Sequence, residues 1–198
     1  MTEPGLSQDT TTSPQAAFRR VDRSVSLLRA NFLMVYFALP SVVLLGGVFV
    51  LVWGATPLLT VLTGGYTTSL IVLLVGILVH EAIHGLTWKI STGKPFGVIT
   101  FGFDWKTITP YAHCSEAMPV NDYRLGAVMP LIVLGIVPSL FAIAGGQGGL
   151  MVFGLFFTFA AGGDMLILWL LRDVSPPALV EDHPSQAGCY VLEPEEQQ

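Results

Sequence analysis

Residues 80–84 read His-Glu-Ala-Ile-His, so three side chains capable of metal or proton chemistry fall within five positions. A helix turns about 100° per residue, and His80 and His84 therefore project from one face, about 40° apart. Two imidazoles in that arrangement can bind one zinc ion. Glu81 lies beside them and can take a proton from a zinc-bound water. The run predicts a zinc-dependent hydrolytic site with Glu81 as general base.

A purely structural role is the alternative, because a histidine in a helix often only satisfies a neighbouring carbonyl group. This run, however, lies near the end of an apolar stretch long enough to cross a bilayer. One charged group at the centre of a membrane helix costs about 2.5–3.5 kcal/mol on insertion scales. Three polar groups without partners would destabilise the helix, which favours a metal site.

The composition indicates a membrane protein. Hydrophobic residues make up 52% of the 198 residues and charged residues only 12%, and the mean hydropathy is +0.65. A soluble domain carries about twice that share of charge. Apolar runs of about 20 residues predict membrane spans, and four occur, at about 32–53, 67–88, 125–144 and 149–171. We expect an all-α polytopic membrane protein whose four-helix domain covers residues 31–172.

Both ends of the chain are expected to be disordered. Residues 1–17 are rich in Thr, Ser, Gln and Pro, and the predicted N-terminal segment extends to residue 30. The tail, residues 173–198, carries six carboxylates and no Lys or Arg. Segments with little apolar surface cannot offset the entropy cost of ordering. The acidic tail serves solubility or docks a partner, and the sequence leaves both open.

The positive charges predict the orientation. Short cytoplasmic loops retain Lys and Arg, and the loops 54–66 and 145–148 have none. The nine basic residues lie before the first span, between the second and third spans, or after the fourth: Arg19, Arg20, Arg23, Arg29, Lys89, Lys94, Lys106, Arg124 and Arg172. We therefore expect a multi-pass integral membrane protein with both termini cytoplasmic. The net charge of −5 argues against nucleic acid as a partner.

Asp164 is the predicted third metal ligand. It is the only acidic residue in the other three spans, and four small residues precede it, at 160–163. At about 1.5 Å per residue, His80 and Asp164 both lie about 20 Å from the outer ends of their helices. Small side chains also let another helix approach closely. Alternatively, Asp164 is a helix-packing carboxylate or a proton relay.

Rival ligands occur in the predicted cytoplasmic segment, where polar side chains cost little. His113 ranks first among them, followed by Cys114, Glu116 and Asp122. Zinc would in either case take three protein ligands and keep one open position, although iron or cobalt could occupy the same site. Cys114 and Cys189 receive no separate role, because neither has the Cys-x-x-Cys partner of a zinc knuckle.

Two further elements are expected around the site. The β-prone runs 97–103 and 105–109 predict a small hairpin in the cytoplasmic segment between the second and third spans. Packing over the helix ends is one role that this hairpin could have. Pro130 and Pro138 each remove a backbone hydrogen bond and should bend the third span. The bend opens a path to the metal, or it is ordinary plasticity of a membrane helix.

The order of these motifs carries a family resemblance. The His-Glu-Ala-Ile-His-Gly helix, an extended segment, a further helix and a helix with Gly-Gly-Asp resemble the core of the site-2 protease class. With Ala-His-Cys-x-Glu-Ala-Met-Pro at 112–119, Met129-Pro130 and Ile136-Val137-Pro138, the chain more closely resembles a family of putative zincin membrane peptidases over about 70–172. The first span is then an added helix.

The resemblance implies that His80, His84 and Asp164 bind zinc and that Glu81 is the general base. It also implies that an extended element near the site holds substrate as an added strand. The chain departs from the site-2 pattern near Asp164, where no Asn-Pro precedes the aspartate and Met165 replaces the usual glycine. That departure puts the substrate-positioning groups in doubt more than the metal ligands.

The expected function is a zinc-dependent intramembrane endopeptidase that hydrolyses a peptide bond of a membrane protein near the cytoplasmic face. The alternative is a non-proteolytic metal-binding membrane protein, either a carrier or an inactive protease relative. Glu81 discriminates between them, since a carrier needs ligands but no general base. The expected partners are the lipid bilayer and a membrane-protein or peptide substrate; a lipid or other ester substrate stays open, and the oligomeric state is not predicted.

Overall fold

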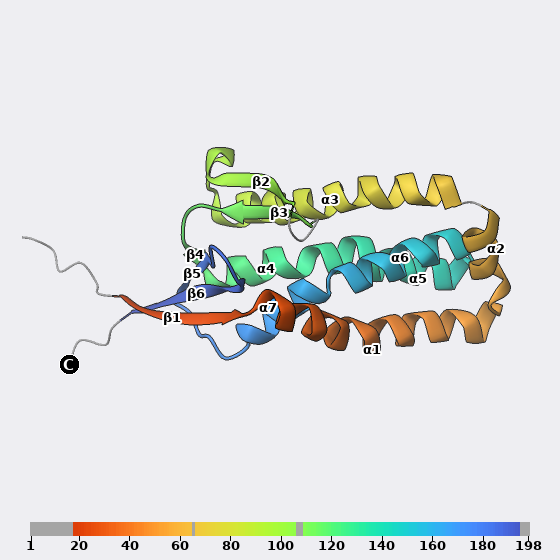
Figure 1. The fold of residues 1–198 in the computed structure, drawn as a ribbon, viewed down its shortest axis with the longest axis horizontal. Coiled ribbons are helices and arrows are strands. Elements are labelled where there is room, and N and C mark those ends of the chain that lie inside the picture. The colour runs from red at the N-terminus through yellow and green to blue at the C-terminus, as the bar shows by residue number, and fades with distance from the viewer. Residues whose placement is uncertain (1–17, 65, 106–108, 195–198) are drawn as a thin grey trace, which may run out of the picture.

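The computed structural model describes residues 18–64, 66–105 and 109–194. Long helices lie side by side along the longest axis, and strands from both ends of the described chain meet at one end of the bundle (Figure 1). Four helical segments are long and apolar enough to cross a membrane: Leu27–Trp53, Leu70–Thr92, Val120–Gly145 and Gly148–Leu170. The prediction of four spans is confirmed.

The first two spans are joined by a short helix. Helix α1, Leu27–Trp53, begins after Ser26, whose side-chain oxygen accepts a hydrogen bond from the Arg29 N–H at 3.4 Å. Helix α2, Thr56–Gly64, follows, where the sequence predicted only a loop. Helix α3, Tyr66–Thr92, then carries the His-Glu-Ala-Ile-His run.

The third and fourth spans are both interrupted. The third consists of α4, Val120–Pro130, a π-helical turn η2, Leu131–Ile136, and α5, Val137–Gly145. The irregular turn follows Pro130 and precedes Pro138, which fits the loss of helical hydrogen bonds at proline. The fourth consists of α6, Gly148–Ala160, and α7, Gly162–Leu170.

The predicted hairpin is present, with its second strand shifted. A short 3-10 turn η1, Phe96–Val98, leads into β2, Ile99–Asp104, which pairs antiparallel with β3, Thr109–Cys114. The second strand was expected at 105–109, but the chain needs residues after Asp104 to reverse direction, so pairing resumes only at Thr109. Residues 106–108 of the predicted strand lie outside the described residues.

A second sheet corrects two predictions. Strands β1, Phe18–Val25, β4, Met118–Pro119, β5, Leu179–Asp182, and β6, Ala187–Pro194, form an antiparallel sheet in the order β1-β6-β5-β4. The expectation of disorder was therefore wrong for residues 18–30, which form β1 and the start of α1, and for most of 173–194. The all-α class was also too narrow, because sheets form at the termini as well as between helices.

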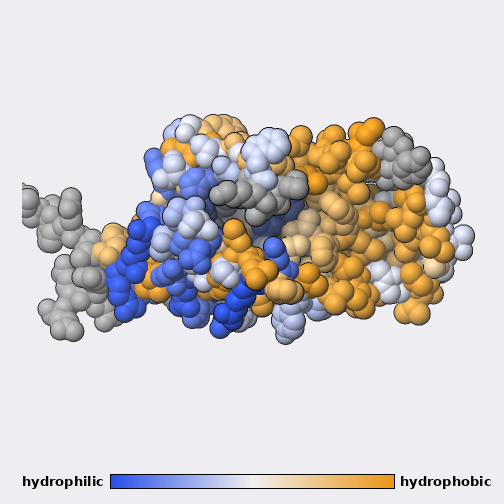
Figure 2. Space-filling view, viewed as in Figure 1, coloured by the Kyte–Doolittle hydropathy of each residue, from blue (hydrophilic) through white to orange (hydrophobic). Residues whose placement is uncertain are grey.

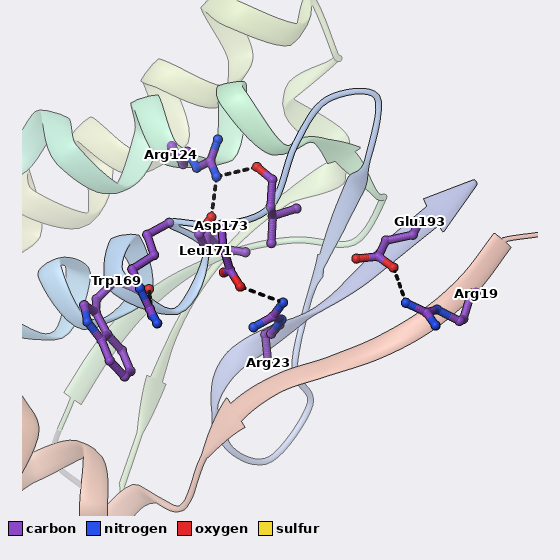
Figure 3. A network of polar contacts seen from close by, with 9 residues as sticks. Arg19, Arg23, Arg124, Trp169, Leu171, Asp173 and Glu193 are labelled. Carbon is purple, nitrogen blue, oxygen red and sulfur yellow. Dashed lines mark hydrogen bonds and ion pairs between the residues drawn. The ribbon is translucent and has the colours of Figure 1, made fainter. Parts of the chain in front are cut away.

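The two terminal segments order each other. Arg19 pairs with Glu193 at 2.7 Å, and Arg23 pairs with Asp173 at 3.2 Å (Figure 3). The apolar side chains of Val180 and Val191 are fully buried on the inner side of the sheet. The prediction of disorder considered the composition of each segment separately. When the two segments pair, their backbone hydrogen bonds are satisfied, and they bury apolar surface that neither segment could bury by itself.

The surface divides into an apolar and a polar part. Apolar side chains cover the helices toward the α2 end, whereas polar side chains gather at the end with the sheets (Figure 2). Leu51 and Phe32 illustrate the apolar part, with 87% and 72% of their surfaces exposed. Exposed apolar surface on long helices is consistent with a multi-pass membrane protein.

Candidate metal centre

The three predicted ligands meet between two helices. Atom Nε2 of His80 on α3 lies 3.2 Å from Oδ2 of Asp164 on α7, and Nε2 of His84 lies 3.3 Å from Oδ1 of the same carboxylate. Both histidines are buried, each with 7% of its surface exposed. Among the described residues, only this cluster brings at least three possible His, Cys, Asp or Glu ligand atoms together, within 4.8 Å of one another.

The break in the fourth span positions Asp164. Because α6 ends at Ala160 and α7 begins at Gly162, Asp164 falls in the first turn of a new helix. The positive end of the helix dipole favours a carboxylate there. A Cβ atom at Gly162 would lie 2.5 Å from the Met34 carbonyl oxygen, so only glycine lets α1 approach this closely. Gly162 therefore serves the close helix packing that the sequence predicted for this run of small residues, whereas a Cβ atom at Gly163 would meet nothing within 4 Å.

His84 is oriented by the neighbouring helix. Its Nδ1 atom lies 3.0 Å from the Gly126 carbonyl oxygen on α4. A ligand histidine commonly donates its second ring N–H to a backbone carbonyl, which leaves Nε2 unprotonated for the metal. The His84 ring also stacks on Trp88, with centroids 5.7 Å apart. A Cβ atom at Gly126 would collide with the Trp88 indole nitrogen, so this glycine leaves room for the stack.

The donor atoms fit a zinc ion. Oδ2 of Asp164 is buried and has no hydrogen-bond partner among the described residues, although His80 is near. The 3.2 Å contact between this oxygen and His80 Nε2 thus does not have hydrogen-bond geometry. Two ligand atoms, each about 2.0 Å from a tetrahedral zinc ion, lie about 3.3 Å apart, close to both nitrogen–oxygen distances. Two imidazoles and a carboxylate are also a donor set of catalytic zinc sites.

Glu81 stands beside these ligands in the same cavity. The cavity has a volume of about 390 Å³, and its walls include His80, Glu81, His84 and Asp164. The carboxylate of Glu81 takes a backbone hydrogen bond from Ala112 on β3. The hairpin therefore reaches the predicted general base, and a base and three ligand atoms share one space.

The rival ligands lie elsewhere. His113 Nδ1 donates to Oδ2 of Asp182 at 2.7 Å, and this hydrogen bond raises the His113 pKa above its usual range. The Cys114 thiol donates to the Glu116 carbonyl oxygen at 3.3 Å, and the Glu116 carboxylate pairs with Lys94. Asp122 lies in the first turn of α4. The geometry thus places Asp164, and not His113, with the two histidines.

Both cysteines are shielded from solvent by burial. Cys114 and Cys189 are buried free thiols. Burial raises the pKa of the Cys189 thiol to about 12, so its reactive thiolate form is rare. The sequence assigns them no role, and their burial is consistent with that.

Sequence reasoning missed two residues that also line the cavity, Asp182 on β5 and Tyr123 on α4. The Tyr123 hydroxyl donates to Oδ1 of Asp182 at 2.5 Å. Asp182 was overlooked because it was assigned to a disordered tail. The signal that could have found it is the apolar run Cys-Tyr-Val-Leu at 189–192, which is typical of a strand and implies a partner strand nearby.

One comparison with known proteins gives a match. A family model described as putative zincin peptidase matches residues 73–179, which is more than half of the chain. No curated protein and no solved structure is matched by the chain. The matched part includes Glu81 and all three clustered ligands, whereas α1, β1 and β6 lie outside it.

Proposed function

The chain belongs to the family of putative zincin peptidases, and from that premise we propose that it is a zinc-dependent intramembrane endopeptidase. It hydrolyses a peptide bond of a membrane protein near the cytoplasmic face of the bilayer. One observation carries this proposal: His80, His84 and Asp164 converge beside Glu81 within helices long enough to cross a membrane.

Each residue of the site has a separate task. His80, His84 and Asp164 would hold the zinc ion. Zinc, when bound, supplies a Lewis acid that polarises the scissile carbonyl and lowers the pKa of a water molecule. Glu81 takes a proton from the attacking water, whose oxygen bonds to the carbonyl carbon. Glu81 then gives that proton to the amide nitrogen as the carbon–nitrogen bond breaks.

The cavity also suits an extended peptide. Pro110, Tyr111 and Ala112 of β3 form part of its wall. Hydrolysis requires an unwound backbone, because a helix shields its carbonyl groups with internal hydrogen bonds. A strand beside the base can keep a substrate segment extended. We therefore propose that the substrate enters as an extended segment next to β3.

The orientation follows from the charges at the two ends of the bundle. Segment 54–64, which includes α2, has no Lys or Arg. Arg19, Arg23 and Arg124 instead surround the terminal sheet at the opposite end (Figures 1 and 3). Because short cytoplasmic segments retain positive charge, we propose that the sheet and both termini lie in the cytoplasm.

Metal binding is tested first. The parent protein and three variants, His80→Ala, Asp164→Ala and His113→Ala, are purified in detergent and analysed by elemental mass spectrometry. We expect about one zinc per chain in the parent, loss of zinc with His80→Ala and Asp164→Ala, and retention with His113→Ala. A correctly folded parent without metal would contradict the proposal.

Cleavage is tested with a library of synthetic transmembrane peptides in detergent micelles, and products are identified by mass spectrometry. We expect the zinc-loaded parent to cut at least one peptide. Glu81→Gln should keep its zinc and lose cleavage, because an amide cannot accept the proton from water. A zinc-loaded parent that cuts no peptide would instead indicate a metal carrier or an inactive relative.

A further inference from the structure

Asp182 is the centre of a partly buried polar network at the edge of the cavity. Its Oδ1 atom accepts the Tyr123 hydroxyl proton at 2.5 Å, and its Oδ2 atom accepts from His113 Nδ1 at 2.7 Å. Oδ2 also receives the backbone N–H of Cys114 at 3.3 Å. The Asp182 side chain is only 16% exposed. Three donors offset the cost of burying its charge, so this carboxylate ties β5, β3 and α4 together.

The first connection leads to the general base. His113 and Cys114 are the last residues of β3, and both bond to Asp182. The residue that precedes them on the strand, Ala112, makes the backbone hydrogen bond to Glu81. Asp182 therefore holds the end of β3 in the register that places Ala112 against the base.

The second connection leads to a metal ligand. Tyr123 and Gly126 lie about one turn apart on α4, and the Gly126 carbonyl oxygen bonds to His84. The Tyr123 ring also stacks on Trp88, with centroids 5.6 Å apart, and Trp88 stacks on His84. The hydrogen bond from Tyr123 to Asp182 thus fixes the part of α4 that orients His84.

We propose that Asp182 is a positioning residue of the hydrolytic site, which holds β3 against Glu81 and α4 against His84 from the C-terminal strand. This inference rests on the proposed function, because a positioning residue requires a hydrolytic site to position. Asp182 lies beyond residues 73–179, where the family model matches. The terminal sheet is thus part of the working site of this chain and not a separate appendage.

The neighbouring residue offers a matched control. Glu181 precedes Asp182 on β5, and alternate residues of a strand point to opposite faces. The Glu181 carboxylate is 40% exposed and lies 3.5 Å from the Arg20 guanidinium. Glu181→Gln removes the same charge from the same strand without touching the network.

The test compares the parent with Asp182→Asn, Tyr123→Phe and Glu181→Gln in detergent. Hydrogen exchange is followed by mass spectrometry, and zinc affinity is measured by competition with a chelator. The values of kcat and KM are measured with the peptide of the library that the parent cuts fastest. Rates are expressed per zinc-loaded molecule. Asp182→Asn should accelerate exchange of the 110–116 backbone by about tenfold. It should also lower kcat by about tenfold, while β1 and β6 exchange as in the parent.

Tyr123→Phe removes one hydrogen bond and keeps the ring, so it answers the question even if Asp182→Asn fails to fold. We expect kcat to fall less in this variant than in Asp182→Asn. We also expect a measurable loss of zinc affinity, because the part of α4 that orients His84 is held less firmly. Unchanged exchange at 110–116 in Asp182→Asn would overturn the inference. Equal effects of Glu181→Gln, or faster exchange throughout β1 and β6, would also overturn it, since either result indicates general support of the sheet.

The two proposals fail in different ways. A zinc-loaded parent that cuts no peptide removes the endopeptidase function. Hydrogen exchange and zinc affinity still decide whether Asp182 holds β3 and α4, because neither measurement requires turnover.

Discussion

The Nε2 atom of His84 lies 3.3 Å from Oδ1 of Asp164, and its Nδ1 atom lies 3.0 Å from the carbonyl oxygen of Gly126. One imidazole thus links three helices, α3, α7 and α4. Because Nδ1 is hydrogen-bonded to a backbone carbonyl, Nε2 is left for a metal. Changes that move either partner should change metal binding.

Gly126→Ala should damage the site without altering any ligand. The new methyl group would overlap the Trp88 indole, which stacks on His84. We expect a loss of about 1–3 kcal/mol in stability, the usual effect of overpacking, and weaker zinc binding. Thermal unfolding and chelator competition measure both effects. Gly47→Ala on α1 is the control, because a Cβ atom there meets nothing within 4 Å; equal behaviour of the two variants would contradict this account.

Asp164→Asn should weaken zinc binding by more than about 100-fold, which exceeds the usual cost of changing an outer contact of a metal site. The amide keeps the shape of the side chain but loses the charge and is a poor zinc ligand. Chelator competition gives the affinity. Asp173→Asn is the charge-matched control, since Asp173 pairs with Arg23 outside the cavity. Similar zinc affinity in both variants would argue that Asp164 only packs helices.

Stability should depend on pH through His113. Its folded pKa is raised by the hydrogen bond to Asp182, so the protonated ring stabilises the fold. That contribution is complete below the unfolded pKa of about 6.5 and is lost as the pH rises through the folded value. Thermal unfolding of the parent and His113→Gln between about pH 5.5 and 9 tests this. The difference should shrink as pH rises; a constant difference would count against it.

Apolar burial should hold the terminal sheet more firmly than its ion pairs do. The Arg19 and Glu193 side chains are 69% and 33% exposed, and exposed pairs contribute about 0–1 kcal/mol. Val191 is fully buried, and its truncation to alanine should lower the free energy of unfolding by about 1–3 kcal/mol. Thermal unfolding of Arg19→Gln and Val191→Ala compares the two. If Arg19→Gln lowered the stability more than Val191→Ala, the ion pair would contribute more than apolar burial, which would contradict this prediction.

The sequence predicted the parts of this fold that local patterns encode. Four apolar runs gave the four spans, and a spacing of four residues placed His80 and His84 on one face. Depth within the spans paired them with Asp164. These inferences succeed because the membrane fixes helix length and because a buried polar residue in it needs a partner.

The terminal sheet could not be predicted in the same way. Strand β1, which carries three arginines, pairs with β6, which follows the fourth span in the sequence. Neither strand can form a sheet without its distant partner. Asp182 was missed for that reason, as its partners His113 and Tyr123 lie on other elements. Helix α2 was missed because nine residues, Thr56–Gly64, resemble a loop and are stabilised mainly by packing on α6.

The pairing of β1 with β6 imposes an order on how the molecule is made. β1 is synthesised before the first span and β6 after the last, so β1 has no partner until every helix has been translated. The strand carrying Asp182 likewise leaves the ribosome only after all four spans. We therefore expect a nascent chain to hold His80, His84 and Asp164 before the site is fully aligned, and to gain activity only after β5 and β6 have been translated.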